Sequence, residues 1–469
     1  MANIQQISIE TEFENAIKSV KNSKKSMLFS YTEQLNDINP LSFYSSAKEL
    51  FKGERFFWKD TNDDLIIVGL GSAHTLQTEL EDDRFKYIEN QWAQLIENAY
   101  IYNPFEDYGT GPLIFGGFSF DSQSVKETEW KFYSEALFLL PKMMLVINKK
   151  KVYLTINLIC MSNDTKETLN NVINIKRNLI TSIHSNNLST AEISKEYEIN
   201  PDGWRQSVAK VVELLKEENE INKVVMARKM KLEFNERISS EIVLEHLLEE
   251  QHESYIFALE AFNCCYTGAS PERLVKKSGN DILSTCLAGS IKRDKDDKID
   301  DALGKALLMD EKNRHEHQLV VSMIAEVIGS FCEQVEIPNE PALLKMRDIQ
   351  HLYTPVRGKI QKHITSILPL VEALHPTPAM GGVPTKEALK VIREMENMDR
   401  GFYAAPIGWM DYRLNGEFAV AIRSGLLKDN EAFLYAGCGV VADSNPEDEY
   451  FETKIKFRPM LRALGGKDL

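Results

Sequence analysis

The sequence lacks an apolar stretch long enough to cross a membrane. Its longest apolar run, residues 136–147, is interrupted by Pro141 and Lys142, whereas a membrane-spanning helix needs about 20 consecutive apolar residues. The first residues, MANIQQISIETEFE, are polar and acidic and are not typical of a signal peptide. We therefore expect no membrane partner.

Cysteine is also scarce, and its spacing excludes the common thiol and zinc motifs. The chain has six cysteines, with no Cys-x-x-Cys pair and no zinc-binding spacing. Most of them lie in apolar segments, which is typical of buried, reduced thiols. This pattern predicts a cytoplasmic protein.

Positive charge is in deficit as well. The chain carries 55 Lys and Arg against 70 Asp and Glu, a formal net charge of −15. Such a surface does not attract nucleic acid or anionic lipid, so we expect neither as a partner. An anionic substrate would therefore have to be held by a local cationic pocket or by a metal ion.

What the sequence does contain indicates an α+β protein with antiparallel strands. Residues 143–147 and 152–158 flank a Lys/Asn-rich tip, a pattern that predicts a hairpin. Residues 1–190 alternate helical and strand patterns, but strand follows strand around this hairpin, which favours an antiparallel sheet over a chain of βαβ units. Residues 182–199 look like a connection between an N-terminal part, 1–190, and a second part, 200–465. Apolar spacing predicts one long helix over residues 298–332.

The most informative stretch is residues 435–456, YAGCGVVADSNPEDEYFETKIK. Small apolar residues interrupted by Gly437 and Gly439 predict a buried strand whose backbone another group approaches closely. Ser444 or Asn445, followed by Pro446, is a typical helix start.

In the predicted helix, Glu449, Glu452 and Lys456 are spaced to share one face. Two carboxylates beside a Gly-rich strand could hold Mg²⁺, which binds through oxygen ligands. The alternative is a solvated helix face with an ion pair between Glu452 and Lys456.

Other polar residues of the second part each allow a structural or a functional interpretation. Lys223 opens an apolar strand, and Glu272 follows a proline in a tight corner. Arg423 lies in an apolar segment, 418–426, that we expect to be a strand. A buried arginine there implies an ion pair, or a carboxylate or phosphate ligand.

The segment His315-Glu316-His317 does not fit a zinc-protease motif. That motif needs histidines four residues apart on one helix face, and here they are two apart. Glu316 remains as a single carboxylate that could face a cation.

Together, the order and spacing of these segments resemble the chorismate-utilising enzyme family, and within it the isochorismate synthases. The resemblance is specific over residues 200–465 and weaker over 1–190, whose length is similar to that of the menaquinone-pathway members. It implies a single large α+β domain in which two antiparallel sheets pack together with helices outside. The segments that carry it are Lys223, SPE (270–272), LAGS (287–290), HEH (315–317), RDIQH (347–351), HPTPA (375–379), AIRS (421–424), YAGCG (435–439) and PEDEYFETKIK (446–456).

The resemblance also implies a role for each position. Lys223 matches the general base and Glu272 the general acid. The Mg²⁺ ligands would be Glu316 and Glu452, with Glu449 reaching the ion directly or through water. The substrate-binding positions would be Gly289, His351, Ala379, Arg423, Gly437 and Lys456.

The implied reaction is the Mg²⁺-dependent isomerisation of chorismate to isochorismate. Water adds at C2 while the C4 hydroxyl leaves, so one group must take a proton and another must give one. Lys223 would have to be neutral and Glu272 protonated, and burial favours both of these states.

Two other functions stay open at this point. A salicylate synthase would go on to release pyruvate, and a non-catalytic protein would bind chorismate without turnover. The amine-transferring members replace the HPTPA segment with a Gly-rich loop and take ammonia from a glutaminase partner, so we expect no such subunit here. Cys438, where a smaller residue is usual, and Gln318, where Glu is frequent, are small departures from the family pattern. The sequence leaves monomer and homodimer open, and its long N-terminal part favours the menaquinone pathway over a siderophore pathway.

Overall fold

The computed structural model describes residues 7–181, 190–217 and 220–467. Within these ranges the strands are β1 (Met27–Leu35), β2 (Arg55–Lys59), β3 (Leu65–Thr78), β4 (Tyr100–Tyr102), β5 (Leu113–Phe118), β6 (Ala136–Asn148), β7 (Lys151–Cys160), β8 (Ile193–Glu198), β9 (Lys223–Phe234), β10 (Tyr255–Ala261), β11 (Cys264–Ser270), β12 (Arg273–Ser278), β13 (Asp281–Lys292), β14 (Cys332–Glu336), β15 (Ala342–Lys345), β16 (Ile349–Ile360), β17 (Gly382–Val383), β18 (Pro406–Asp411), β19 (Gly416–Val420), β20 (Ser424–Lys428) and β21 (Glu431–Val440).

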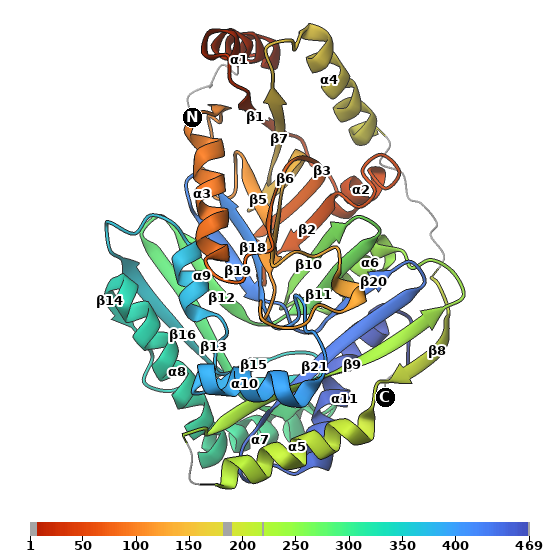
Figure 1. The fold of residues 1–469 in the computed structure, drawn as a ribbon, viewed down its shortest axis with the longest axis vertical. Coiled ribbons are helices and arrows are strands. Elements are labelled where there is room, and N and C mark those ends of the chain that lie inside the picture. The colour runs from red at the N-terminus through yellow and green to blue at the C-terminus, as the bar shows by residue number, and fades with distance from the viewer. Residues whose placement is uncertain (1–6, 182–189, 218–219, 468–469) are drawn as a thin grey trace.

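The helices of the described residues lie mostly outside these strands (Figure 1). No helix among them is long and apolar enough to span a membrane. The α-helices are α1 (Ile9–Ser23), α2 (Pro40–Ser46), α3 (Arg84–Glu97), α4 (Lys166–Thr181), α5 (Pro201–Lys216), α6 (Ser240–Glu250), α7 (Asp297–Met309), α8 (Glu311–Phe331), α9 (Leu368–Leu374), α10 (Thr385–Glu396) and α11 (Pro446–Ala463), and one 3-10 helix covers Thr128–Trp130.

The strands form one hydrogen-bonded sheet that divides into two arms at β6. One edge of β6 pairs with β3 along its length, and the other edge pairs with β5 in its first half and β7 in its second. The first arm continues from β3 through β2, β10, β11, β20, β21 and β9. The second continues from β5 through β18, β19, β12, β13 and β16. All these pairings are antiparallel, which confirms the predicted α+β class, and the two expected sheets are these two arms.

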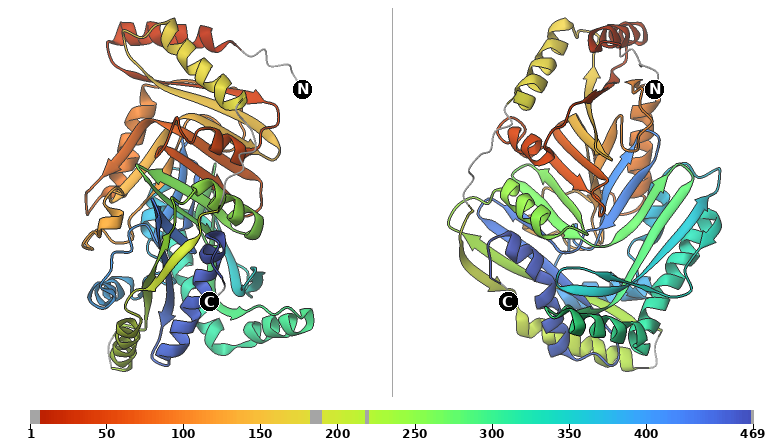
Figure 2. Two further views of the ribbon diagram at one scale, coloured as in Figure 1. Left: turned by 90° about the vertical axis from the view of Figure 1, so that its right-hand side faces the viewer. Right: turned by 180° about the vertical axis from the view of Figure 1, so that it is seen from behind.

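Strands from both parts of the chain are interleaved in each arm. β2 pairs with β10, and β5 pairs with β18. Helices α1 and α4 lie at one end of the molecule, and α5, α7 and α11 lie at the other (Figures 1 and 2). The division of the chain near residues 190–200 stays a prediction.

Local sequence signals explain several of these elements. The predicted hairpin is formed by β6 and β7, and its turn residues Lys149 and Lys150 have positive φ angles of 46° and 73°. Two consecutive positive φ values give the turn the twist that antiparallel strands require. Helix α11 begins as predicted, because the Asn445 side chain accepts hydrogen bonds from the backbone N–H groups of Glu447 and Asp448.

One predicted helix was wrong. The single helix expected over 298–332 is two helices, α7 and α8, because the Asp310 side chain accepts from the backbone N–H of Asn313 and starts a new helix. The connection expected over 182–199 contains strand β8, which pairs with the second half of β9. Residues 182–189 of that connection lie outside the described residues.

Candidate active site

The two arms of the sheet enclose a cavity of about 320 Å³, a size typical of small-molecule sites. β9 and β21 of the first arm form one wall, and β13 and β16 of the second arm form another. α8 and α11, which pack on β13 and β21, complete it. Every residue given a role from the sequence lines this cavity: Lys223, Glu272, Gly289, Glu316, His351, Ala379, Arg423, Gly437, Glu449, Glu452 and Lys456.

Lys223 reaches the cavity across a glycine of the neighbouring strand. It is the first residue of β9, and a Cβ atom added at Gly439 of β21 would lie 2.6 Å from its Cε. A side chain at position 439 would therefore displace the lysine. The close approach that the Gly437–Gly439 pattern predicted is confirmed, and the group that approaches Gly439 is Lys223.

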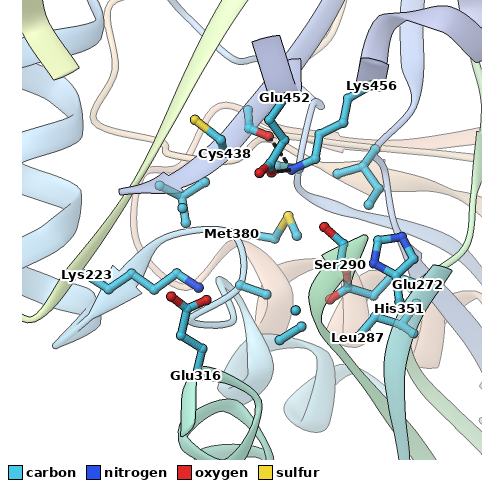
Figure 3. A pocket seen from close by; sticks show the side chains of 18 of the residues that line it. Lys223, Glu272, Leu287, Ser290, Glu316, His351, Met380, Cys438, Glu452 and Lys456 are labelled. Atoms are coloured by element: carbon cyan, nitrogen blue, oxygen red, sulfur yellow. Dashed lines mark hydrogen bonds and ion pairs between the residues drawn. The ribbon is translucent and has the colours of Figure 1, made fainter. Parts of the chain in front are cut away.

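Glu272 lies in the corner between β11 and β12 and is only 4% exposed. Burial raises its pKa to about 8, although Arg423, Lys223 and Lys456 act in the opposite direction. A carboxyl with this pKa is largely protonated at neutral pH. Lys223 and Glu272 enter the cavity from opposite sides (Figure 3).

Gly289 and His351 lie together where β13 departs from regular pairing with β16. The register shifts between Leu287 and Ser290, and Gly289 has a φ of +77°, which favours glycine. Burial, together with Arg423 and Lys456, lowers the pKa of His351 to about 3, so its ring is neutral. Bulges of this kind re-aim polar groups, and here the irregular segment faces the cavity.

Arg423 does not lie in a strand, contrary to the prediction. The segment expected over 418–426 divides into β19 and β20, and Arg423 lies between them with a φ of +52°. Within the described residues, no hydrogen bond or ion pair joins its guanidinium to another side chain. The cavity therefore contains a cation that is free to bind an anion.

Helix α11 places its polar face in the cavity, as its spacing predicted. Lys456 Nζ lies 2.5 Å from Glu452 Oε1 and 2.8 Å from the carbonyl oxygen of Gly437. Burial and the neighbouring charge of Glu452 raise the pKa of Glu449. Burial alone would raise the pKa of Glu452, but Lys456 and Arg423 outweigh it and lower that pKa.

The backbone of Gly437 also faces away from β9. Its partner in the ladder is Ala227, whose N–H donates to Glu396 and whose carbonyl accepts from Trp204. Opposed residues in an antiparallel pair turn their peptide groups either toward each other or away from each other. Gly437 therefore turns its N–H and carbonyl toward the opposite edge of β21, where Lys456 binds the carbonyl.

The three residues of the HEH segment have different environments in α8. His315 is exposed, and Glu316 lines the cavity and points toward Lys223 (Figure 3). His317 is buried and hydrogen bonded, with Nδ1 3.0 Å from the carbonyl oxygen of Ala288 and Nε2 2.8 Å from Thr354 Oγ1. The different environments of the two histidines agree with the predicted lack of a shared face.

The carboxylates of the cavity are not gathered into a preformed cluster. Across residues 7–181, 190–217 and 220–467, no group of three or more His, Cys, Asp or Glu side chains could hold a metal ion. Mg²⁺ commonly uses only one or two protein carboxylates and completes its shell with water and substrate oxygens. The hard oxygen donors fit that ion, because Glu449 and Glu452 repel each other and a cation would relieve the repulsion.

Several lining residues were not found from the sequence. Arg400 and Tyr403 belong to the Asp-Arg-Gly-Phe-Tyr segment before β18, and Lys312 and Asn313 lie one turn before Glu316 in α8. In the first segment, the signal that could have pointed to the site was an arginine and an aromatic residue beside a glycine. In α8, the three-residue spacing from Asn313 to Glu316 was the signal.

The fold and the cavity can be compared with those of known enzyme families. The family model described as "Chorismate binding enzyme" matches residues 15–465, so the chain belongs to the chorismate-binding enzyme family.

Particular relatives are similar over nearly the whole chain. The isochorismate synthase MenF of Bacillus subtilis is 41% identical over 97% of both chains. The salicylate biosynthesis isochorismate synthase of Pseudomonas aeruginosa is 34% identical over 97% of this chain and 94% of its own. The solved structure of the menaquinone-specific isochorismate synthase MenF from Escherichia coli is 23% identical, with a TM-score of 0.77 over 97% of this chain and 99% of that one, and shows the same fold.

Proposed function

We propose that the protein is an isochorismate synthase, which isomerises chorismate to isochorismate. The observation that carries this proposal is the placement of an amine, Lys223, and a protonated carboxyl, Glu272, on opposite sides of one cavity. A reaction that adds water at one ring carbon and expels hydroxide at another needs a base and an acid placed in this way. The names of the B. subtilis and P. aeruginosa relatives support the same activity.

Chorismate is a dianion, and the cavity offers the charges to bind it. Arg423 has no partner of its own among the described side chains, so it is available to a substrate carboxylate. Lys456 and the backbone amides of Gly289 and Gly437 supply further donors. Ala379 leaves room for the ring, and neutral His351 offers a hydrogen bond without adding charge.

The proton transfers follow from the positions of the two opposed groups. Lys223 would take a proton from the water that attacks C2 of the ring. Glu272 would give its proton to the C4 hydroxyl, which leaves as water while the ring double bonds shift. Because one water enters and one leaves, the product has the mass of the substrate. General acid and base groups typically contribute about 10²-fold to 10⁴-fold each.

Mg²⁺ is the cofactor that the donor set suits. Glu316 and Glu452 would hold it, and Glu449 would bind directly or through water. When bound, the cation would neutralise and orient the ring carboxylate of the substrate. In this structure Lys456 forms an ion pair with Glu452. If Glu452 held the cation instead, Lys456 would be available to the substrate.

We also propose that water rather than ammonia is the nucleophile, so that no glutaminase subunit is needed. The six cysteines are all buried and unpaired, which supports a reducing, cytoplasmic setting. The long N-terminal part supports a role in menaquinone biosynthesis, because the B. subtilis MenF matches 97% of the chain and so most of this part.

The test is product analysis after incubation with chorismate and Mg²⁺. The expected product is an isomer of equal mass, formed without pyruvate. Lys223→Ala and Glu272→Gln should each lower kcat by at least about 10²-fold. Lys231→Ala is the matched control, because Lys231 lies on the same strand but pairs with Glu233 and Glu431 outside the cavity.

Each other outcome has a definite meaning. Stoichiometric pyruvate would identify a salicylate synthase instead. Chorismate binding without turnover would identify a non-catalytic binding protein. Full activity in both the Lys223 and the Glu272 variants would overturn the proposed acid and base.

A further inference from the structure

Within the described residues, the outer edge of β9, which faces away from β21, pairs with other strands only at its two ends. β17 pairs with Lys223 and Val224 at one end, and β8 pairs with residues 230–234 at the other. Between these pairings, Val225 and Ala227 turn their peptide groups to an edge with no strand in the described part of the chain. Unpaired peptide groups in a buried position would be costly, so other groups must satisfy them.

An ion pair between Glu396 and Arg400 takes the place of the missing strand. The carboxylate of Glu396 accepts the N–H of Ala227 at 2.7 Å. Arg400 donates from NH2 to the carbonyl oxygen of Val225 at 2.7 Å and from Nε to Glu396 at 2.9 Å. Trp204 completes the edge by donating its indole N–H to the carbonyl oxygen of Ala227 at 2.9 Å.

The same arginine also holds the loop that carries Ala379. Its NH1 donates to the carbonyl oxygen of Met380 at 3.0 Å, and the N–H of Val225 donates to the carbonyl oxygen of Gly381. The two charged side chains are almost completely buried, at 2% and 1% exposure. Arg400 therefore ties together two walls of the cavity, the start of β9 and the loop at 376–381.

The position of Lys223 depends on this edge. Lys223 lies two residues before Val225, and its side chain passes within contact distance of Gly439 on the other side of the strand. A shift of β9 away from β21 would move the amine relative to the ring. Misplacement of a reacting group by about 1 Å typically costs about 10²-fold in rate.

We propose that Glu396 and Arg400 form a positioning pair that holds Lys223 and the Ala379 loop at the distance the reaction requires. This inference rests on the proposed function, and neither residue acts on the substrate in it. The two side chains bind peptide groups of β9 that a neighbouring strand would otherwise bind, close to the proposed base Lys223.

The test compares Arg400→Lys and Glu396→Gln with the wild type. We expect kcat for chorismate turnover to fall about 10-fold to 100-fold and KM to change by less than about threefold. Arg393→Lys is the matched control, because Arg393 lies on the same helix as Glu396, α10, but pairs with Asp121 instead of binding the backbone of β9. The control variant should keep wild-type kcat and KM.

Two further measurements separate positioning from general damage. Calorimetric titration with chorismate should give the wild-type number of binding sites, whereas a partly unfolded sample would show fewer. Hydrogen exchange should rise over residues 223–229 and stay unchanged over β10, which lies in the same arm.

The outcomes distinguish this inference from the function on which it rests. A wild-type enzyme that does not isomerise chorismate would defeat the proposed function. An active wild type with unchanged kcat in folded Arg400→Lys or Glu396→Gln would overturn the positioning role. If neither variant folds, the pair serves the fold rather than the site, and the inference is also wrong.

Discussion

Replacing Glu272 with Gln should change how stability depends on pH. The folded protein holds the carboxyl proton up to a pKa of about 8, whereas the unfolded chain releases it near the ordinary value of 4.5. Between those values only the folded state keeps this proton, so the free energy of unfolding falls as pH rises. Between pH 5 and pH 8, the titration of Glu272 lowers the free energy of unfolding by about 3–4 kcal/mol.

The Glu272→Gln variant has no carboxyl to titrate at this position, so its free energy of unfolding should not show this decrease with pH. For a chain of 469 residues, the entropy of unfolding is about 1 kcal/mol per kelvin. The difference in Tm between Glu272→Gln and the wild type should therefore shift by about 3–4 °C in favour of the variant from pH 5 to pH 8. Thermal unfolding of both proteins in metal-free buffer at several pH values measures it.

Glu417→Gln is the control for this experiment. Glu417 is also fully buried, but Lys276 and Arg273 outweigh the effect of burial and lower its pKa. Its carboxylate is largely ionised in both states over pH 5–8, so the Tm difference from the wild type should hardly depend on pH there. A Tm difference for Glu272→Gln that is equally constant would refute the burial argument for Glu272.

Three further variants or treatments test other contacts in the cavity. Gly439→Ala should lower kcat, because its methyl group would displace Lys223. Gly329→Ala is the control: with open space around the added Cβ, it should keep wild-type kinetics and gain up to about 1 kcal/mol of stability. Equal kinetics in both variants would contradict the contact between Gly439 and Lys223. Arg423→Met should lower kcat/KM about 10-fold to 100-fold by removing a charged hydrogen bond, measured by steady-state kinetics, and an unchanged KM would argue against carboxylate binding there. EDTA should abolish turnover, and Glu452→Gln should raise the Mg²⁺ concentration for half-maximal activity; activity that survives chelation would exclude the metal.

The sequence predicted those features whose signals are local. The cap at Asn445 and the spacing of Glu449, Glu452 and Lys456 define both the start of α11 and its polar face, and the structure has both. The hairpin of β6 and β7 followed from two apolar segments, 143–147 and 152–158, on either side of a Lys/Asn-rich tip. In each case the residues that determine the geometry are neighbours in the chain.

The features that were missed depend on contacts between distant segments or on one competing signal. The predicted helix ran across Asp310, but the side chain of that residue caps a new helix and so divides it. Arg423 lies in an apolar segment, and its positive φ is set by the junction of β19 and β20. The role of Arg400 depends on hydrogen bonds to Val225 and Met380, which no local pattern reveals.

The central claim is that water, activated beside Lys223, adds to the ring while Glu272 protonates the departing hydroxyl. The most direct test is to run the reaction in water enriched in oxygen-18 and analyse the product by mass spectrometry. The account predicts an isomer of chorismate that carries one oxygen-18 atom at C2. An isomer without the label would contradict it, because the hydroxyl would then have migrated without exchange with solvent.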